Sequence, residues 1–203
     1  MILKATLPLI SPFSSAAEVS TKFSLRLPKV SPEERLLRAA RRGGPVALGT
    51  PAAPYEPAGR SPLAALEGTD GLEIAVVTRS PEIVRELELL AELDRRSSVT
   101  VELMVPAADP VLAWKLEAVT RLAAEGIAVR VLCPLAAGVD DGEAALRKLL
   151  GAARDAGAWD VRALAAPGKR LRLSLRPRTG AALATFLRLR LEYGFPREMT
   201  GRG

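Results

Sequence analysis

The side chains that most often carry catalysis are scarce in this sequence. It contains one cysteine, Cys133, and no histidine among 203 residues. A Ser-His-Asp or Cys-His catalytic system would have no imidazole, and one chain cannot build a zinc site from four cysteines or from two cysteines and two histidines. Haem ligation by histidine and a disulfide framework are excluded as well. The cysteine usage indicates a reducing, cytoplasmic setting.

A short run of carboxylates offers one candidate metal site. Asp140, Asp141 and Glu143 could hold Mg²⁺ through their oxygens. Alternatively, Asp141 caps the helix expected to begin near Gly142, where acidic side chains are favoured by the helix dipole. Of the two interpretations, we favour capping.

The most unusual segment is the arginine-rich stretch 169–178, KRLRLSLRPR. As a β-strand over 171–175 it would place leucines on one face and Arg170, Arg172 and Arg176 on the other, with Arg178 following. Guanidinium groups suit phosphates and carboxylates. The row could contact the phosphates of a nucleic acid, protect a sheet edge by its charge, or dock onto an acidic partner protein. No aromatic residue is interleaved for base stacking, so edge protection or partner docking is favoured.

Positive charge also exceeds negative charge over the whole chain. The formal net charge is +6, the isoelectric point is near 10, and the excess is mainly arginine. A second basic group consists of Arg35, Arg38, Arg41 and Arg42. A basic surface favours polyanions, so nucleic acid and acidic proteins are the candidate partners.

Short aliphatic runs that alternate with amphipathic stretches must position these groups. The runs expected to be strands are 46–49, 72–77, 99–105, 127–132 and 161–165. The stretches expected to be helices are 31–42, 60–66, 80–95, 109–124, 142–156 and 179–192. Alternation at roughly 25–30 residues is typical of βαβ units and predicts a parallel sheet. No apolar run is long enough for a transmembrane helix.

Several loops between these elements carry distinctive residues in a definite order. After the first expected strand come Gly49, Pro54, Tyr55 and Pro57. The second expected strand ends in Thr-Arg-Ser at 78–80, and its helix carries Arg-Glu ahead of leucines.

A later loop holds Pro134, Gly138, Asp140 and Asp141. In this order and spacing, over about residues 12–168, the loops resemble those of the spore photoproduct lyase-like branch of the radical S-adenosylmethionine (SAM) enzymes. The resemblance implies a partial (β/α) barrel of the TIM type, with about five to six parallel strands and truncated at the N-terminus. It also implies that Pro134, Gly138, Asp140 and Asp141 are the counterparts of the loop near the SAM adenine.

The chain departs from that family where the iron–sulfur cluster would bind. The family holds its [4Fe–4S] cluster with a Cys-x3-Cys-x2-Cys loop, which leaves one iron open for SAM. The corresponding positions here are Ala16, Ser20 and Phe23. None of them can supply a thiolate, and Cys133 lies much later in the chain. We therefore expect no cofactor and no metal.

These observations predict three segments and a non-catalytic role. The segments are an irregular remnant of the cluster loop over 1–30, a partial barrel over 31–168, and a basic strand and helix over 169–203. We expect a radical-SAM-like pseudoenzyme that acts as an accessory subunit, with another protein or a second copy as partner. The alternative is a nucleic-acid-associated protein, and an active radical SAM or lyase-like enzyme comes third.

A different active site could also reuse the barrel, because catalytic groups in such barrels lie at the carboxyl ends of the strands. The polar residues expected there are Thr50, Tyr55, Glu56, Thr78, Arg79, Asp109, Asp140 and Asp141.

Overall fold

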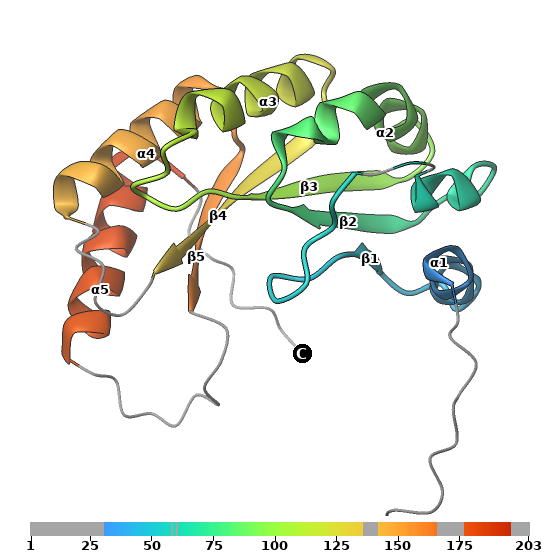
Figure 1. Ribbon diagram of the computed structural model, residues 1–203, viewed down its shortest axis with the longest axis horizontal. Coiled ribbons are helices and arrows are strands. Elements are labelled where there is room, and N and C mark those ends of the chain that lie inside the picture. Colours follow the sequence, from blue (N-terminus) through green and yellow to red (C-terminus); the bar gives the residue numbers. More distant parts are fainter. Residues whose placement is uncertain (1–30, 58, 60, 136–141, 166–176, 196–203) are drawn as a thin grey trace, which may run out of the picture. The chain divides into compact units, whose positions relative to one another are not determined.

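The computed structural model describes residues 31–57, 59, 61–135, 142–165 and 177–195 (Figure 1). The chain divides into two units, Met1–Ser31 and Pro32–Gly203, and every helix and strand described belongs to the second. The segment expected to be irregular, 1–30, and the expected basic strand, 171–175, lie outside the described residues.

Helices and parallel strands alternate along the second unit, as expected. The strands are β1 (Val46–Leu48), β2 (Glu73–Thr78), β3 (Ser98–Met104), β4 (Ala128–Leu135) and β5 (Asp160–Ala165). The α-helices are α1 (Pro32–Arg41), α2 (Leu87–Asp94), α3 (Leu112–Ala124), α4 (Glu143–Asp155) and α5 (Pro177–Glu192), and two 3₁₀ segments are η2 (Pro62–Leu66) and η3 (Pro81–Glu86). The five strands are all parallel and lie in the order β1-β2-β3-β4-β5. The α/β class and the partial barrel-like arrangement are therefore confirmed.

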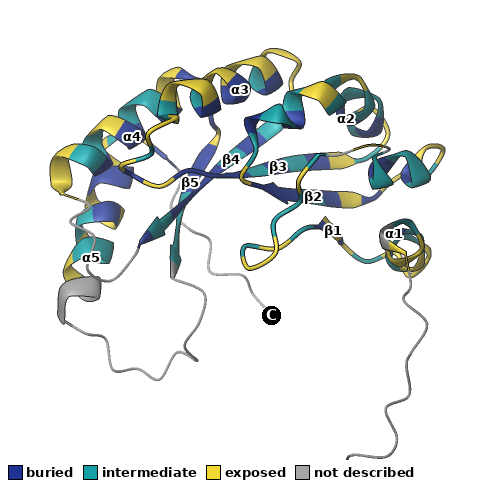
Figure 2. Ribbon diagram, in the orientation of Figure 1, coloured by how far each residue is buried: buried dark blue, intermediate teal, exposed yellow. Residues whose placement is uncertain are grey.

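Strand order explains why the main core lies on one face of the sheet. Crossovers between parallel strands are right-handed, so consecutive strands place their connecting helices on the same side (Figure 1). Alternate strand residues such as Val101, Val131 and Val161 form one buried cluster with residues of all five α-helices. The outward sides of α3 and α4 are exposed (Figure 2). Within the described part of the chain, no helix is both long and apolar enough to cross a membrane.

The other set of alternate strand residues points to the helix-free face. There Val77, Met104 and Leu132 form a small buried cluster, separate from the main core, with Leu164 packed against it. The remaining positions on this face of β3, β4 and β5 are largely polar or charged. The sheet therefore has one aliphatic face under the helices and one mixed face.

The segment after β2 is not the single helix over 80–95 that the sequence predicts. Ser80 accepts a hydrogen bond from the Glu82 amide as an N-cap, but η3 follows first and α2 begins only at Leu87. Glu86 stands at the junction, where its carboxylate accepts hydrogen bonds from two hydroxyl groups of the connection between β1 and β2. These hydrogen bonds hold Glu86 at the end of the 3₁₀ segment η3. The expectation of one continuous helix is therefore wrong.

The fourth strand extends beyond the expected end at 132, through Pro134 to Leu135. The Leu132 carbonyl accepts from Val105 on the β3 side. Because successive residues of a strand direct their backbone groups to opposite sides, Pro134 also directs its nitrogen toward the β3 side. A nitrogen that faces β3 takes no part in the pairing with β5, and the last pair between β3 and β4 is Met104–Leu132. The missing N–H of Pro134 therefore costs no ladder hydrogen bond. Pro134 is thus a strand residue and not the loop residue that the SAM-loop resemblance implies.

Three helix starts also differ from expectation. Helix α3 begins at Leu112, three residues after the expected start at Asp109. Helix α5 begins at Pro177, which suits the first turn because proline lacks an amide hydrogen there. Arg178 is therefore helical and does not continue a strand. Helix α4 begins at Glu143 with Gly142 at the N-cap position, and the expected cap, Asp141, lies outside the described residues.

Gly49 allows the loop after β1 to return against β2. Its φ is +82°, and a β-carbon built there would lie 2.4 Å from the Val77 carbonyl oxygen and 2.5 Å from the Tyr55 amide nitrogen. That amide donates to the Val77 carbonyl at 2.7 Å. Only glycine fits both this backbone conformation and this close approach.

Replacing Gly49 by alanine should therefore destabilise the fold strongly. Gly68 is the matched control, because its φ is +80° but nothing lies within 4 Å of the position that a β-carbon would take there. We expect Gly68→Ala to cost about 1–2 kcal/mol from the left-handed conformation alone. Gly49→Ala should cost at least about 2 kcal/mol more, because backbone atoms must move as well. Urea unfolding of both variants measures the difference, and equal losses would contradict the close approach.

Candidate functional site

The structure describes only some of the residues that the sequence analysis singled out. Pro134 lies in β4 and Arg178 in α5, but Gly138, Asp140, Asp141, Arg170, Arg172 and Arg176 lie outside the described residues, as do Ala16, Ser20 and Phe23. Glu143, the third carboxylate of the candidate Mg²⁺ site, pairs with Arg147 and Arg188 on the surface. Its pKa is lowered, mainly by the hydrogen bonds from Arg188 and Arg147.

At the carboxyl ends of β1 and β2, the polar groups are hydrogen-bonded to one another. Thr78 is fully buried, and its hydroxyl donates to the Tyr55 carbonyl at 2.6 Å. The Tyr55 hydroxyl donates to Glu86, which also accepts from Ser61 at 2.8 Å. Burial raises the pKa of Tyr55 to about 12, helped by the hydrogen bond to Glu86. A phenol with so high a pKa stays protonated near neutral pH and fastens this loop to η3.

A second group at the carboxyl end of β3 is also engaged. The Lys115 ammonium lies 2.8 Å from the Asp109 carboxylate and donates to the Met104 carbonyl at 2.9 Å. Both side chains are almost fully buried. Asp109 accepts from the Val111 amide as well. The pair therefore joins the end of β3 to the first turn of α3.

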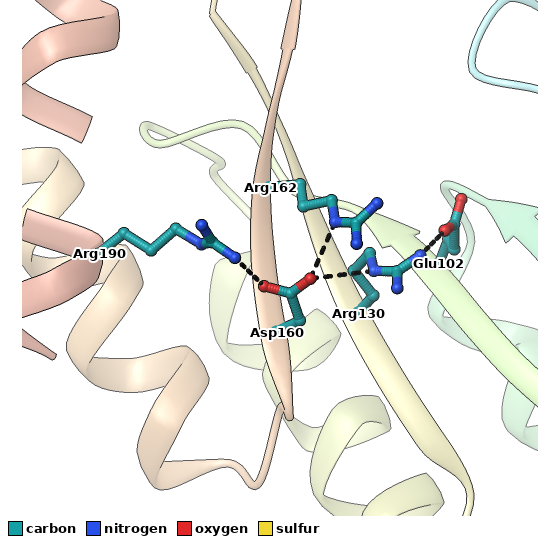
Figure 3. Close-up of polar contacts among 5 residues, drawn as sticks. All are labelled: Glu102, Arg130, Asp160, Arg162 and Arg190. Carbon is teal, nitrogen blue, oxygen red and sulfur yellow. Dashed lines mark hydrogen bonds and ion pairs between the residues drawn. The ribbon is translucent and has the colours of Figure 1, made fainter. Parts of the chain in front are cut away.

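The largest charged cluster among the described residues lies instead on the helix-free face (Figure 3). Parallel register places Glu102, Arg130 and Asp160 in one row across β3, β4 and β5. Arg162 follows two residues after Asp160 on β5, and Arg190 reaches the cluster from α5. We call these five residues the arginine–carboxylate network.

Asp160 is the centre of this network. Its Oδ1 accepts from Arg190 at 2.7 Å, and its Oδ2 accepts from the Nε atoms of Arg162 at 2.9 Å and Arg130 at 3.2 Å. Burial favours the neutral acid and works to raise the pKa of Asp160, but hydrogen bonds from Arg190 and Arg162 outweigh it, so the pKa is lowered. Asp160 is therefore ionised near neutral pH.

The remaining contacts fix Arg130 and bury Arg190. Arg130 donates through Nη1 to Glu102 and lies 4.9 Å from the centre of the Trp159 ring, a cation–π geometry. The Arg190 side chain is only 3% exposed. Its Nε is buried without a hydrogen-bond partner in the described structure.

The sequence analysis did not identify this network. In the sequence, the network is marked by polar residues that alternate with aliphatic ones in three expected strands. Glu102 lies in the third expected strand and Arg130 in the fourth, and Asp160 and Arg162 lie at the start of the fifth. Parallel pairing in consecutive order would have aligned these positions, given the register. Arg190 carried no such signal, because it is one of several arginines on α5.

No group of metal-ligating side chains occurs in the parts of the chain that the structure describes. Glu102 and Asp160 are both bound by guanidinium groups. The arrangement is suited to holding strands together and to presenting guanidinium nitrogens, and its carboxylates are not free to bind a cation.

Neutralising Asp160 should destabilise the protein in a pH-dependent way. Removing one partner of a buried ion pair costs about 3–5 kcal/mol of folding stability. We therefore expect Asp160→Asn to lower the free energy of unfolding by about this amount near neutral pH. Because the pKa is lower in the folded state, the contribution of Asp160 is present above the ordinary carboxyl pKa of about 3.9 and is lost as the pH falls through the folded value.

Urea unfolding of wild type and Asp160→Asn, near neutral pH and at about pH 3, checks this expectation. The difference between the two should shrink at the lower pH. Asp70→Asn is the control, because Asp70 is exposed and its replacement should change stability by less than about 0.5 kcal/mol. A pH-independent difference would show that Asp160 is not ionised in the fold.

In comparisons with known proteins, no protein-family model and no curated protein matches this chain. The resemblance to the radical SAM branch stays a prediction from the residues that carry it. What the chain does must therefore be argued from the geometry of its sheet and of the arginine–carboxylate network.

Proposed function

We propose that this protein is a non-catalytic, radical-SAM-like accessory subunit of a larger protein complex. The observation that carries the proposal is the state of the buried and half-buried polar groups at the carboxyl ends of the strands, where barrel enzymes keep their reactive side chains. Tyr55, Thr78, Asp109 and Lys115 all hydrogen-bond within the chain. Each of these bonds fastens a loop or a helix start, so these groups serve the scaffold.

The open sheet supports the partner in this proposal. Within the described residues, β1 and β5 each pair with a strand on one side only. The unpaired backbone groups of an edge strand can form hydrogen bonds with a strand of another chain. Near β5, Trp159 is 45% exposed, and on α5 Leu187 and Leu191 are 41% and 49% exposed. A partner that pairs with β5 would remove an open edge, and one that contacts these side chains would remove exposed apolar area from water.

One observation favours nucleic acid as the second candidate. Arg35, Arg38, Arg41 and Arg42 are basic residues on α1 and the turn after it, and Arg35, Arg41 and Arg42 are exposed. Arg38 pairs with Glu34, its neighbour one turn earlier. Such a group could contact phosphates without reading sequence.

The first test of the proposed function concerns the missing cluster. After anaerobic reconstitution with iron and sulfide, we expect neither stoichiometric iron nor the absorbance of a [4Fe–4S] cluster, because Ala16, Ser20 and Phe23 lack thiolates. A radical SAM enzyme with three cluster cysteines, treated in parallel, is the positive control. Bound iron together with reductive cleavage of SAM would overturn the non-catalytic assignment.

The second test concerns the partner. Tagged protein, expressed at its native level and isolated from its own host, should migrate as a complex of defined composition, larger than the 21.6 kDa chain. Nuclease treatment and high salt should leave that complex intact. If salt instead releases a nucleic acid, and Arg35→Glu/Arg42→Glu abolishes its binding, the second candidate replaces the first. A free monomer that binds neither would contradict both.

A further inference from the structure

Among the described residues, two arginines of the network keep terminal nitrogens without a hydrogen bond. Asp160 Oδ2 accepts from the Nε atoms of both Arg130 and Arg162. Figure 3 shows both guanidinium groups extending from Asp160 toward the same side. Arg130 uses Nη1 for Glu102, but within the described structure no hydrogen bond engages Arg130 Nη2 or either terminal nitrogen of Arg162.

The charges of the network do not balance. Three arginines face two carboxylates, so one formal positive charge remains. Arg190 is buried against Asp160, and Arg130 lies against Trp159 and Glu102. Arg162 is the most exposed member, at 41%. The uncompensated charge is therefore accessible at Arg162.

Arg162 stands between the charged row of Arg130 and Asp160 and apolar residues of the same face. Register places Arg162 in the same row as Leu132 and Met104, and the next row along β4 and β5 holds Pro134 and Leu164. Apolar neighbours lower the local dielectric, which strengthens an ion pair formed there. A planar guanidinium with both terminal nitrogens available can bind a carboxylate through two parallel hydrogen bonds.

We infer that Arg162, assisted by Arg130 Nη2, binds the carboxylate of an acidic side chain that a partner subunit presents beside an apolar residue. This inference rests on the proposed function for the source of the carboxylate. One residual positive charge matches a carboxylate monoanion, whereas a phosphate dianion would leave the buried face with excess negative charge. Asp160 and Trp159 act as positioning residues, because they orient the two guanidinium groups.

A matched pair of blocked dipeptides tests the site directly. Acetyl-Leu-Glu-amide and acetyl-Leu-Gln-amide differ only in the carboxylate, and inorganic phosphate tests the other anion. In ¹⁵N-labelled protein at constant ionic strength, the Arg162 Nε–H and Trp159 indole N–H resonances report binding. We expect the Glu peptide to bind about tenfold or more tightly than the Gln peptide and than phosphate.

Substitutions then assign the effect to Arg162. Arg162→Gln should remove the preference for the Glu peptide, and Arg162→Lys should weaken it less, because the charge stays but the planar fork is lost. Arg85→Gln is the control, since Arg85 is exposed on η3. Equal affinity for the two peptides, tighter binding of phosphate, or an unchanged Arg162→Gln variant would overturn the inference.

The isolated complex separates this inference from the proposed function. If the Glu peptide binds through Arg162 but the chain is a free monomer in its host, the site stands and the proposed function fails. If a complex forms and Arg162→Gln retains its partner at full stoichiometry, the proposed function stands and the inference that the partner binds at Arg162 is overturned.

Discussion

The buried carboxylate of Asp160 is the interaction on which the second half of the sheet depends. It binds arginines from β4, β5 and α5, and through Arg130 it is linked to Glu102 on β3. Four elements therefore meet at one ionised group. Burying such a group is favourable only because several charged donors compensate for the water that it loses. The surface ion pairs between α4 and α5 contribute much less individually, since they are exposed to solvent.

This dependence explains the mixed character of the helix-free face. In a closed barrel, layers of side chains fill the interior. Here Glu102, Arg130 and Asp160 form ion pairs across neighbouring strands, and the next row is apolar except for Arg162. A sheet built this way can keep carboxylates on the face opposite the main core, because each is paired with arginine, one of them with Arg190 from α5. The same pairing commits the carboxylates to structure.

Much of the fold could be predicted from the sequence, because local patterns decide it. Each of the five expected strands is present, with ends shifted by up to three residues, and the Pro, Ser and Gly signals correctly marked most helix starts and ends. The errors arose where tertiary contacts modify a local pattern: Glu86 at the start of α2, and Pro134 beyond the last pair with β3. The network could not be predicted in the same way, since it needed the register of three strands and a helix residue, Arg190, 30 positions from Asp160.

The order of the strands has a consequence for how the molecule assembles. Every strand pairs with its neighbours in the sequence, so each strand–helix unit can dock onto the one before it with a short loop to close, as in repeat proteins. The contacts of Asp160 break this pattern, because they need β3, β4, β5 and α5 together. The early units can thus form in chain order, whereas Asp160 gains its last donor, Arg190, only when the final helix docks.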